Sequence, residues 1–241
     1  MISPMKIAIE SVERACPESE IFENRLSLDN KQILELGCGR ADLTRVIATT
    51  GSGRQIIALE VDEIQHTKNL EIDDLPNVTF NLAGAESIPV EDASIDVVMM
   101  FKSLHHVPID FMPQGLSEVH RVLKPGGMAY ISEPVFAGEF NEILRLFHDE
   151  EKVRQAAFKS VVNAVESGKF KLLEQIFFNA PMAFENFDAF EQQVIGVTHT
   201  DHQLSPEVHE QVKQRFTRNL GPDGAKFLMP IRVDLLQKPS D

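Results

Sequence analysis

The sequence has no tryptophan, one tyrosine and two cysteines among its 241 residues. The single tyrosine, Tyr130, falls in the middle of a predicted strand, so a cage of Trp and Tyr rings around a cation is excluded. Cys16 and Cys38 lie in different predicted elements and form neither a CxxC pair nor a disulfide framework. This cysteine usage favours a reducing, cytoplasmic location.

Basic residues are also scarce, because 23 Lys and Arg stand against 37 Asp and Glu, for a formal net charge of −14. No run of Lys or Arg is long enough to follow a phosphate backbone, so nucleic acid is not an expected partner. No apolar run approaches the ~18 residues of a membrane span, and the N-terminal stretch lacks a signal-peptide core. We therefore expect a soluble protein that acts on something other than nucleic acid or membrane.

The first half of the chain alternates short β-rich runs with helical patterns. The β-rich runs are 32–36, 55–61, 77–82, 95–101 and 127–133, and the helical patterns are 41–50, 62–72 and 110–123. The last helical pattern ends in "KPGG", which predicts a helix stop and a turn. This alternation predicts βαβ units and a doubly wound parallel sheet.

The second half has a different pattern. Residues 139–167 carry apolar side chains at helical spacing, and ten of the 16 Phe fall between Phe136 and Phe190. Two late strands are predicted at 172–178 and 229–237, with a helix at 205–216 that Ser205 would cap. Together the two halves predict an α/β fold with a mostly parallel seven-stranded sheet and a helical cover. Packing within the cover explains the Phe residues more simply than an apolar lid over a ligand does.

The stretch "QILELGCGRADL" (32–43) reads as a strand, a Gly-x-Gly turn and a helix start. Gly37 and Gly39 would let a ligand approach the backbone at the carboxyl end of the strand. A dinucleotide fingerprint needs a third small residue where this chain has Asp42, and Glu35 adds a second carboxylate. Two carboxylates oppose a pyrophosphate but suit a ligand with an ammonium and a sulfonium, such as S-adenosylmethionine. Structural roles for Glu35 and Asp42 stay open.

A carboxylate at the end of the second strand can accept both ribose hydroxyls of an adenosine. Glu60, in "ALEVD", is the preferred candidate because it directly follows the apolar run. Asp62 is the competitor, and its alternative role is to cap the next helix.

The segments "ELGCGRA", "ALEVD", "GAESIPVEDASIDVV", "LHHV" and "RVLKPGG" occur in this order over roughly residues 30–134. Together they resemble the class I S-adenosylmethionine-dependent methyltransferases, particularly the ubiquinone/menaquinone-biosynthesis-type branch (methyltransferase domain 11/25-like), with a Rossmann-like fold. The resemblance implies an N-terminal helical segment over the site (1–30), a cofactor-binding core (31–134) and an acceptor-site cover with the last two strands (135–241).

The resemblance also implies which residues bind S-adenosylmethionine. The turn would hold the methionine and ribose, Glu60 the ribose, the next positions the adenine, and the end of the fourth strand the methionine moiety. These residues are Glu35, Gly37, Cys38, Gly39, Glu60, Val61, Ala85, Glu86, Phe101 and Lys102.

The sequence departs from the family pattern at two positions. Ala41 stands where the family turn commonly has a third Gly, and alanine can still begin a helix. Gly84 stands where the family often has an Asp that accepts a hydrogen bond from the adenine amino group. Adenine recognition is therefore expected to use Glu86 or backbone groups.

Methyl transfer from a sulfonium is an in-line displacement that needs alignment above all, with a base only where the acceptor must lose a proton. His105 and His106 follow the fourth strand and are candidates for that base, the alternative being loop histidines that hold the backbone. Glu133 ends the fifth strand and would orient a cationic acceptor or cap a turn. Lys102 would pair with the cofactor carboxylate, an acceptor anion or water.

Other polar residues of the second half are harder to assign. A metal site is conceivable but its spacing matches no ligand signature, so no metal is predicted; the residues are His148, Asp149, His199, Asp201 and His202. Arg232, in a late apolar run, would pair with a structural Asp or Glu or bind a substrate carboxylate.

The sequence thus predicts an S-adenosylmethionine-dependent methyltransferase acting on a small molecule. One alternative is a protein that binds the cofactor without transferring a methyl group. Another is a nicotinamide-dependent reductase, against which Asp42 and the lack of a Tyr-x-x-x-Lys pair both count. The acceptor, the methylated atom and the oligomeric state are not determined by these patterns.

Overall fold

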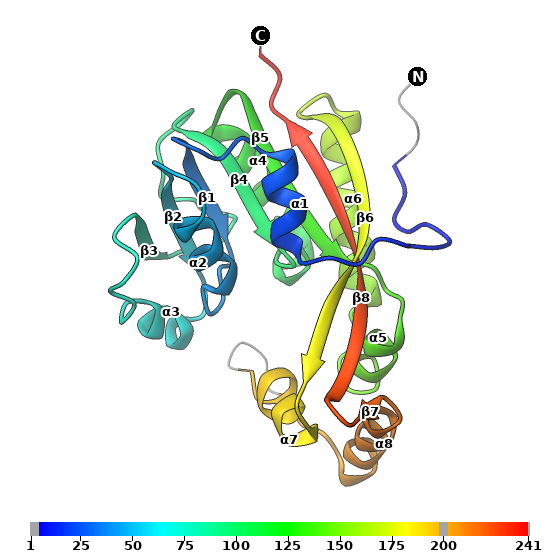
Figure 1. The fold of residues 1–241 in the computed structure, drawn as a ribbon. Coiled ribbons are helices and arrows are strands. Elements are labelled where there is room, and N and C mark those ends of the chain that lie inside the picture. Colours follow the sequence, from blue (N-terminus) through cyan, green and yellow to red (C-terminus); the bar gives the residue numbers. More distant parts are fainter. Residues whose placement is uncertain (1–4, 198–201, 241) are drawn as a thin grey trace.

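A computed structural model describes residues 5–197 and 202–240, and it is built around one open, twisted β-sheet (Figure 1). Five parallel strands form its first half: β1 (Gln32–Leu36), β2 (Gln55–Glu60), β3 (Val78–Leu82), β4 (Ile95–Phe101) and β5 (Leu123–Pro134). The helical elements between them are α2 (Asp42–Thr49), α3 (Glu63–Asn69), the 3-10 turns η1 (Leu104–His106) and η2 (Ile109–Phe111), and α4 (Met112–Val122).

The strand order sets the place where sheets of this kind bind ligands, and we call the region beyond the carboxyl ends of β1 and β4 the crevice. Seven strands follow the order β3-β2-β1-β4-β5-β8-β6, and the two-residue β7 (Leu220–Gly221) pairs with β8. The direction of winding reverses between β1 and β4, so their carboxyl ends flank the switch point at which such sheets bind ligands. The predicted doubly wound, mostly parallel sheet is confirmed, with β8 (Gly224–Gln237) antiparallel to both of its long neighbours.

Side chains of the buried strands alternate between two apolar layers, as the period of two in a strand requires. Leu34 and Val98 face the layer that contains α4 and α6 (Glu151–Glu166). Ile33 and Val97 face the layer that contains α1 (Glu18–Arg25) and α2. Because both faces are covered, the central strands read as continuous apolar runs in the sequence.

The "KPGG" segment only partly behaves as predicted. Helix α4 does end directly before it, at Val122, but residues 124–127 belong to β5 rather than to a separate turn. Leu123 pairs with Ile95 and Met128 with Val97, so the residues between bulge out of the ladder. A side chain at Gly127 would lie 2.9 Å from the carbonyl of residue 124, which explains the glycine at this bulge.

The stretch 139–167, which has helical spacing in the sequence, forms two helices in the structure. They are α5 (Glu139–Leu144) and α6, separated by residues 145–150. The backbone N–H of Glu151 donates to Asp149 Oδ1 at 3.0 Å, so Asp149 supports the start of α6. The break also brings Glu150 into contact with His105, in the loop that follows β4. Helical periodicity within 139–167 cannot predict this contact.

Two long antiparallel strands carry a second, smaller apolar core. β6 (Lys171–Phe184) and β8 run past the edge of the parallel sheet, and α5, α7 (Phe187–Phe190) and α8 (Pro206–Thr217) pack around them (Figure 1). A π-helical turn, η3 (Glu191–Ile195), follows α7, and Ser205 caps α8 as predicted. We call this core the Phe lobe; it consists of Phe140, Ile143, Phe184, Phe187, Phe190, Val212, Phe216, Ala225 and Phe227. Its aromatic residues are therefore packing residues, as the simpler explanation predicted.

The N-terminal residues lie along the other edge of β6. Asn179 exchanges backbone hydrogen bonds with Arg14 and Cys16, at 2.8 and 3.1 Å, and its side chain donates to the Val12 carbonyl. Helix α1 follows and buries Phe22 against Phe101 and Tyr130. Among the described helices, none is long and apolar enough to cross a membrane.

Candidate active site

The glycine turn lies where the fold places the crevice, directly after β1. The backbone N–H groups of Gly37 and Cys38 both donate to the Leu59 carbonyl at 2.9 Å, which ties the turn to β2. Gly37 has φ +74°, and a side chain there would meet Ser103 Cβ at 2.7 Å. Gly39 is also left-handed, at φ +52°, with no atom within 4 Å of the place of a side chain. This turn needs glycine for its backbone and, at Gly37, for the close approach of the loop after β4.

Glu35 lies beneath the turn. It is 2% exposed and accepts a hydrogen bond from Thr44 Oγ1 of α2 at 2.6 Å. Burial raises the pKa of Glu35 to about 7, and the Thr44 hydrogen bond and Lys102 counteract this only in part. Glu35 thus fixes the start of α2 relative to β1.

Glu60 closes the turn from the end of β2. Its Oε2 accepts from the Gly39 backbone N–H at 2.7 Å, and its Oε1 accepts from the N–H groups of Val61 and Asp62 at 2.8 and 2.9 Å. Asp62, the competing candidate, accepts from the first N–H groups of α3 and is its N-cap. Asp42 is 76% exposed in its side chain and pairs with Arg40. Of the three carboxylates, Glu60 alone lies against the glycine backbone.

The end of β4 lies opposite the turn. Phe101 packs on Phe22 and Tyr130, each with a ring-centroid distance of 5.6 Å. Lys102 has a left-handed backbone, with φ +54°, and its Nζ is 2.9 Å from Glu18 Oε2. Glu18 comes from α1 and is 6% exposed, so the N-terminal helix contributes a buried carboxylate to the crevice. The sequence patterns did not identify this residue, because its partner lies 84 positions away.

The predicted adenine side of the crevice is more open. Val61 is 66% exposed, whereas Ala85 is buried under α4 next to Gly115. The Glu86 carboxylate occupies the space that a side chain at Gly84 would need. Glu86 therefore stands beside the position at which the family pattern has an Asp.

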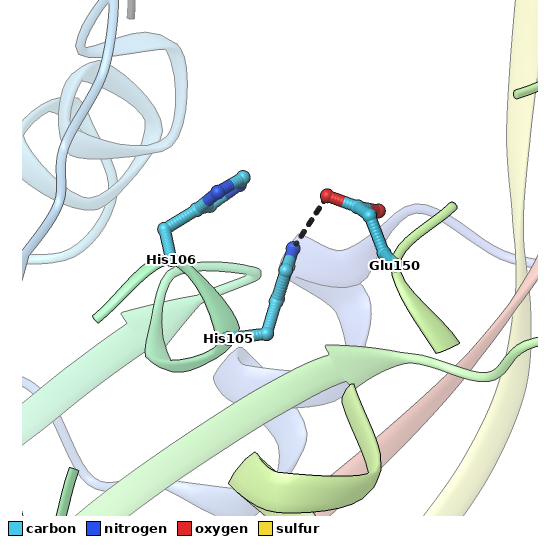
Figure 2. Close-up of side chains that lie close together, drawn as sticks. All are labelled: His105, His106 and Glu150. Carbon is cyan, nitrogen blue, oxygen red and sulfur yellow. Dashed lines mark ion pairs between the residues drawn. The ribbon is translucent and has the colours of Figure 1, made fainter. Parts of the chain in front are cut away.

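A buried polar chain begins at His105. Its Nδ1 lies 2.6 Å from Glu133 Oε2 and its Nε2 lies 3.4 Å from Glu150 Oε1 (Figure 2 shows the second pair). Glu133 is 1% exposed, and its Oε1 accepts from the Leu104 N–H at 3.0 Å. Arg154 completes the chain, with Nη2 2.6 Å from Glu150 Oε2. Glu133 thus positions the His105 ring and does not itself reach the solvent.

The charges in this chain are mutually stabilising. Burial by itself would lower the pKa of His105, but Glu133 and Glu150 raise it to about 9. Burial would raise the pKa of Glu150, and His105 and Arg154 instead hold it well below its usual range. Glu133 follows the same pattern, and His105 keeps the pKa of its carboxyl below the ordinary value.

Two further histidines border the chain. His106 is exposed, and its ring centroid is 4.1 Å from that of His105. His148 Nε2 is 3.1 Å from Glu150 Oε1, and His202 packs on His148 with centroids 4.7 Å apart. Asp149 is exposed at the start of α6 and takes no part, and His199 and Asp201 lie outside the described residues. The sequence patterns drew attention to His148 and His202 but not to Glu150. The Glu150 carboxylate lies between His105 and His148 and contacts both.

Arg232 has a partner of its own. It is 2% exposed, and its Nε donates to Asp234 Oδ2 at 2.8 Å while its guanidinium lies 4.5 Å from the centre of the Phe158 ring. Asp234 also accepts from Gln175 at 2.6 Å, and burial raises the pKa of its carboxyl. Arg232 therefore forms a structural ion pair with Asp234, which was one of the two roles predicted for it.

Comparison with known proteins agrees with this geometry. Residues 33–127 match the family described as methyltransferase domain. A probable S-adenosylmethionine-dependent methyltransferase of Mycolicibacterium smegmatis is 32% identical over 126 residues, which cover 50% of this chain and 46% of that protein. The 27-O-demethylrifamycin SV methyltransferase of Amycolatopsis mediterranei is 29% identical over 150 residues, covering 58% of this chain and 50% of that protein. The matched part spans half or less of each of these relatives.

Solved structures share the fold over nearly the whole chain. An S-adenosylmethionine-dependent methyltransferase of Methanosarcina mazei superposes with a TM-score of 0.56 at 17% identity, covering 92% of this chain and 98% of that one. At this identity the likeness concerns the fold alone. Residues 33–127 are thus a methyltransferase domain by sequence similarity, and the relatives that this part of the chain matches include a probable S-adenosylmethionine-dependent methyltransferase.

Proposed function

We propose that this protein transfers the methyl group of S-adenosylmethionine to a small-molecule acceptor by direct in-line displacement. The observation that carries the proposal is the charge of the crevice. The Glu60 carboxylate lies against the glycine turn, and the Glu18 carboxylate lies at the end of β4, where Lys102 pairs with it. Glu35, buried beneath the turn with its pKa raised to about 7, adds negative charge only when it is ionised. This arrangement favours an ammonium and a sulfonium and disfavours a pyrophosphate.

Glu60 is the residue expected to hold the cofactor ribose. Its carboxylate already accepts backbone N–H groups from the glycine turn and from the two residues that follow β2, so its position is determined before any ligand arrives. A preorganised acceptor loses little entropy on binding, which supports a role in affinity. The 2′-hydroxyl that such a carboxylate accepts is present in S-adenosylmethionine and NAD alike, so the charge of the crevice has to discriminate between them.

The polar chain from Glu133 to Arg154 supports an acceptor side next to the cofactor. His106 is the exposed member and therefore the one that an acceptor can reach. Acting as a base within hydrogen-bond reach, it would take a proton from a hydroxyl, amine or thiol. Net charge −14 and the small-molecule name of the rifamycin relative favour a small acceptor over nucleic acid. Two buried free thiols accord with a reducing, cytoplasmic setting.

The first test is titration calorimetry with S-adenosylhomocysteine, with NADH as the parallel ligand. We expect S-adenosylhomocysteine to bind and the variant Glu60→Gln to bind about 10 to 100 times more weakly, since hydrogen bonds to charged groups contribute roughly 1.5–3 kcal/mol each. Glu63→Gln is the matched control, because it removes one exposed carboxylate three residues away. Binding of NADH alone would favour the reductase alternative and refute the proposed cofactor.

The second test asks for turnover. The full chain is incubated with S-adenosylmethionine and pools of phenols, carboxylic acids, amines and thiols, and released S-adenosylhomocysteine and methylated products are measured by mass spectrometry. Product formation from one pool supports transfer and identifies the acceptor class. Tight cofactor binding without product from any pool counts for the alternative of a binding protein that transfers nothing.

A further inference from the structure

We propose that His105, His106 and Glu150 form a binding site for one divalent transition-metal ion beside the cofactor crevice. The three side chains converge on one point, and their ligand atoms all lie within 4.8 Å of one another (Figure 2). Two histidine nitrogens and a carboxylate oxygen are a ligand set that Zn²⁺, Mn²⁺ and Fe²⁺ accept. No metal was predicted from the sequence, and this set differs from the residues considered there. Its carboxylate, Glu150, comes from the break between α5 and α6 and lies far from the two histidines in the sequence.

The distances suit a common ion. His105 Nε2 and Glu150 Oε1 are 3.4 Å apart. Two ligand atoms at bonds of about 2.1 Å from one tetrahedral ion lie at about this separation. His106 follows His105 on the short 3-10 turn, and one of its ring nitrogens falls within the 4.8 Å that spans the ligand atoms of all three residues.

Both buried ligands are held from behind. Glu133 accepts from Nδ1 of His105, which directs Nε2 toward Glu150, and the Leu104 N–H fixes Glu133 in turn. Arg154 binds Oε2 of Glu150 and leaves Oε1 facing the histidines. A carboxylate behind a ligating histidine is the usual outer support of a metal site.

The proposed site is accessible from one side and carries negative charge. His105 is 4% and Glu150 5% exposed, whereas His106 opens to solvent, so the site has one accessible side. Glu133 and Glu150 outweigh Arg154 by one formal negative charge when the imidazoles are neutral.

His148 is the available fourth ligand. Its Nε2 lies 3.1 Å from the same Glu150 oxygen, and its side chain is 31% exposed. If the proposed methyl transfer holds, an oxygen or nitrogen of the acceptor would take this fourth position in place of His148, and the ion instead of His106 would then favour the deprotonated acceptor. That consequence rests on the proposed function, whereas the metal site itself does not.

The test uses the full chain stripped with a chelator and then titrated with Zn²⁺ by calorimetry and with Co²⁺ by absorption spectroscopy. We expect one equivalent to bind, with the Co²⁺ bands of a nitrogen and oxygen sphere. The exposed His106→Ala should weaken binding at least 10-fold without unfolding the protein, and Glu133→Gln should weaken it 10- to 100-fold. His209→Ala is the matched control, since His209 also lies beside a carboxylate, 2.5 Å from Glu191, but in the Phe lobe.

The outcomes separate this site from the cofactor site. Absence of stoichiometric binding, or binding and Co²⁺ bands unchanged in His106→Ala, overturns the metal proposal. Equal loss in His209→Ala overturns it as well, because binding would then be unspecific. S-adenosylhomocysteine calorimetry on the metal-free protein tests the proposed function separately, so either proposal can fail while the other stands.

Discussion

Glu35 makes the stability of this protein depend on pH in a direction opposite to that of an ordinary surface carboxylate. Burial raises the pKa of Glu35 from 4.5 to about 7 in the folded protein. Between these two values the unfolded chain releases a proton that the folded chain retains. The free energy of unfolding therefore falls as pH rises from about 4.5 to 7 and levels off above that range. At 1.36 kcal/mol per unit of pKa, the ionisation of Glu35 lowers the free energy of unfolding by about 3 kcal/mol over this pH range.

The variant Glu35→Gln removes the carboxyl group and with it this pH dependence of the free energy of unfolding. Glutamine keeps the volume of the side chain and an oxygen that can accept from Thr44, so the packing between β1 and α2 is preserved. We expect the variant to become more stable relative to the wild type as pH rises, gaining on the order of 3 kcal/mol between about pH 5 and pH 8.

The measurement is urea unfolding of both proteins across that pH range. Other titrating groups, including His105 and Asp234, contribute equally to both and cancel in the difference. The exposed Glu63→Gln serves as control and should run parallel to the wild type. Parallel curves for Glu35→Gln would show that Glu35 is ionised in the folded protein and refute the reasoning.

Two further predictions concern the turn and the Phe lobe. Gly37→Ala should lower the free energy of unfolding by more than Gly39→Ala, because both substitutions cost roughly 1–2 kcal/mol for a left-handed residue but only the first meets Ser103; equal losses in urea unfolding would contradict this. Phe190→Ala should destabilise the lobe by about 3–5 kcal/mol, seen as faster amide hydrogen exchange in α7 and α8, with S-adenosylhomocysteine affinity unchanged. Loss of that affinity would show that the lobe and the crevice are coupled.

The parallel half of the fold could be predicted closely because its strands are short, apolar and separated by turn residues. The strands at 32–36 and 95–101 occur with the predicted bounds. The break between α5 and α6 was missed because residues 145–150 leave helical geometry to make tertiary contacts, and periodicity within one segment carries no information about those. Glu18 and Glu150 escaped notice for the same reason, since each is defined by a partner that folding brings near.

The sequence also left the roles of Asp62 and Arg232 open, and hydrogen bonds to residues nearby in the chain decide them. Asp62 proves to be a helix cap, and Arg232 pairs with Asp234 two residues on. The predicted cofactor residues lie around one crevice, but their contacts with S-adenosylmethionine stay predictions. Glu133 was expected at the rim and is instead buried behind His105, because the loop after β4 and the start of α6 cover the end of β5.

The N-terminal segment ties residues that are far apart in the chain, and this bears on the order in which the protein assembles. Lys6 bonds to Gln175 and Ile7 to Arg232, across 169 and 225 positions. Contacts of such long range form late, after shorter loops have closed. On the ribosome, Lys6 and Ile7 must therefore wait for β6 and β8 before they dock. We expect nascent chains that lack β8 to leave Glu18 and its helix undocked, so that the crevice is completed only after β8 has been made.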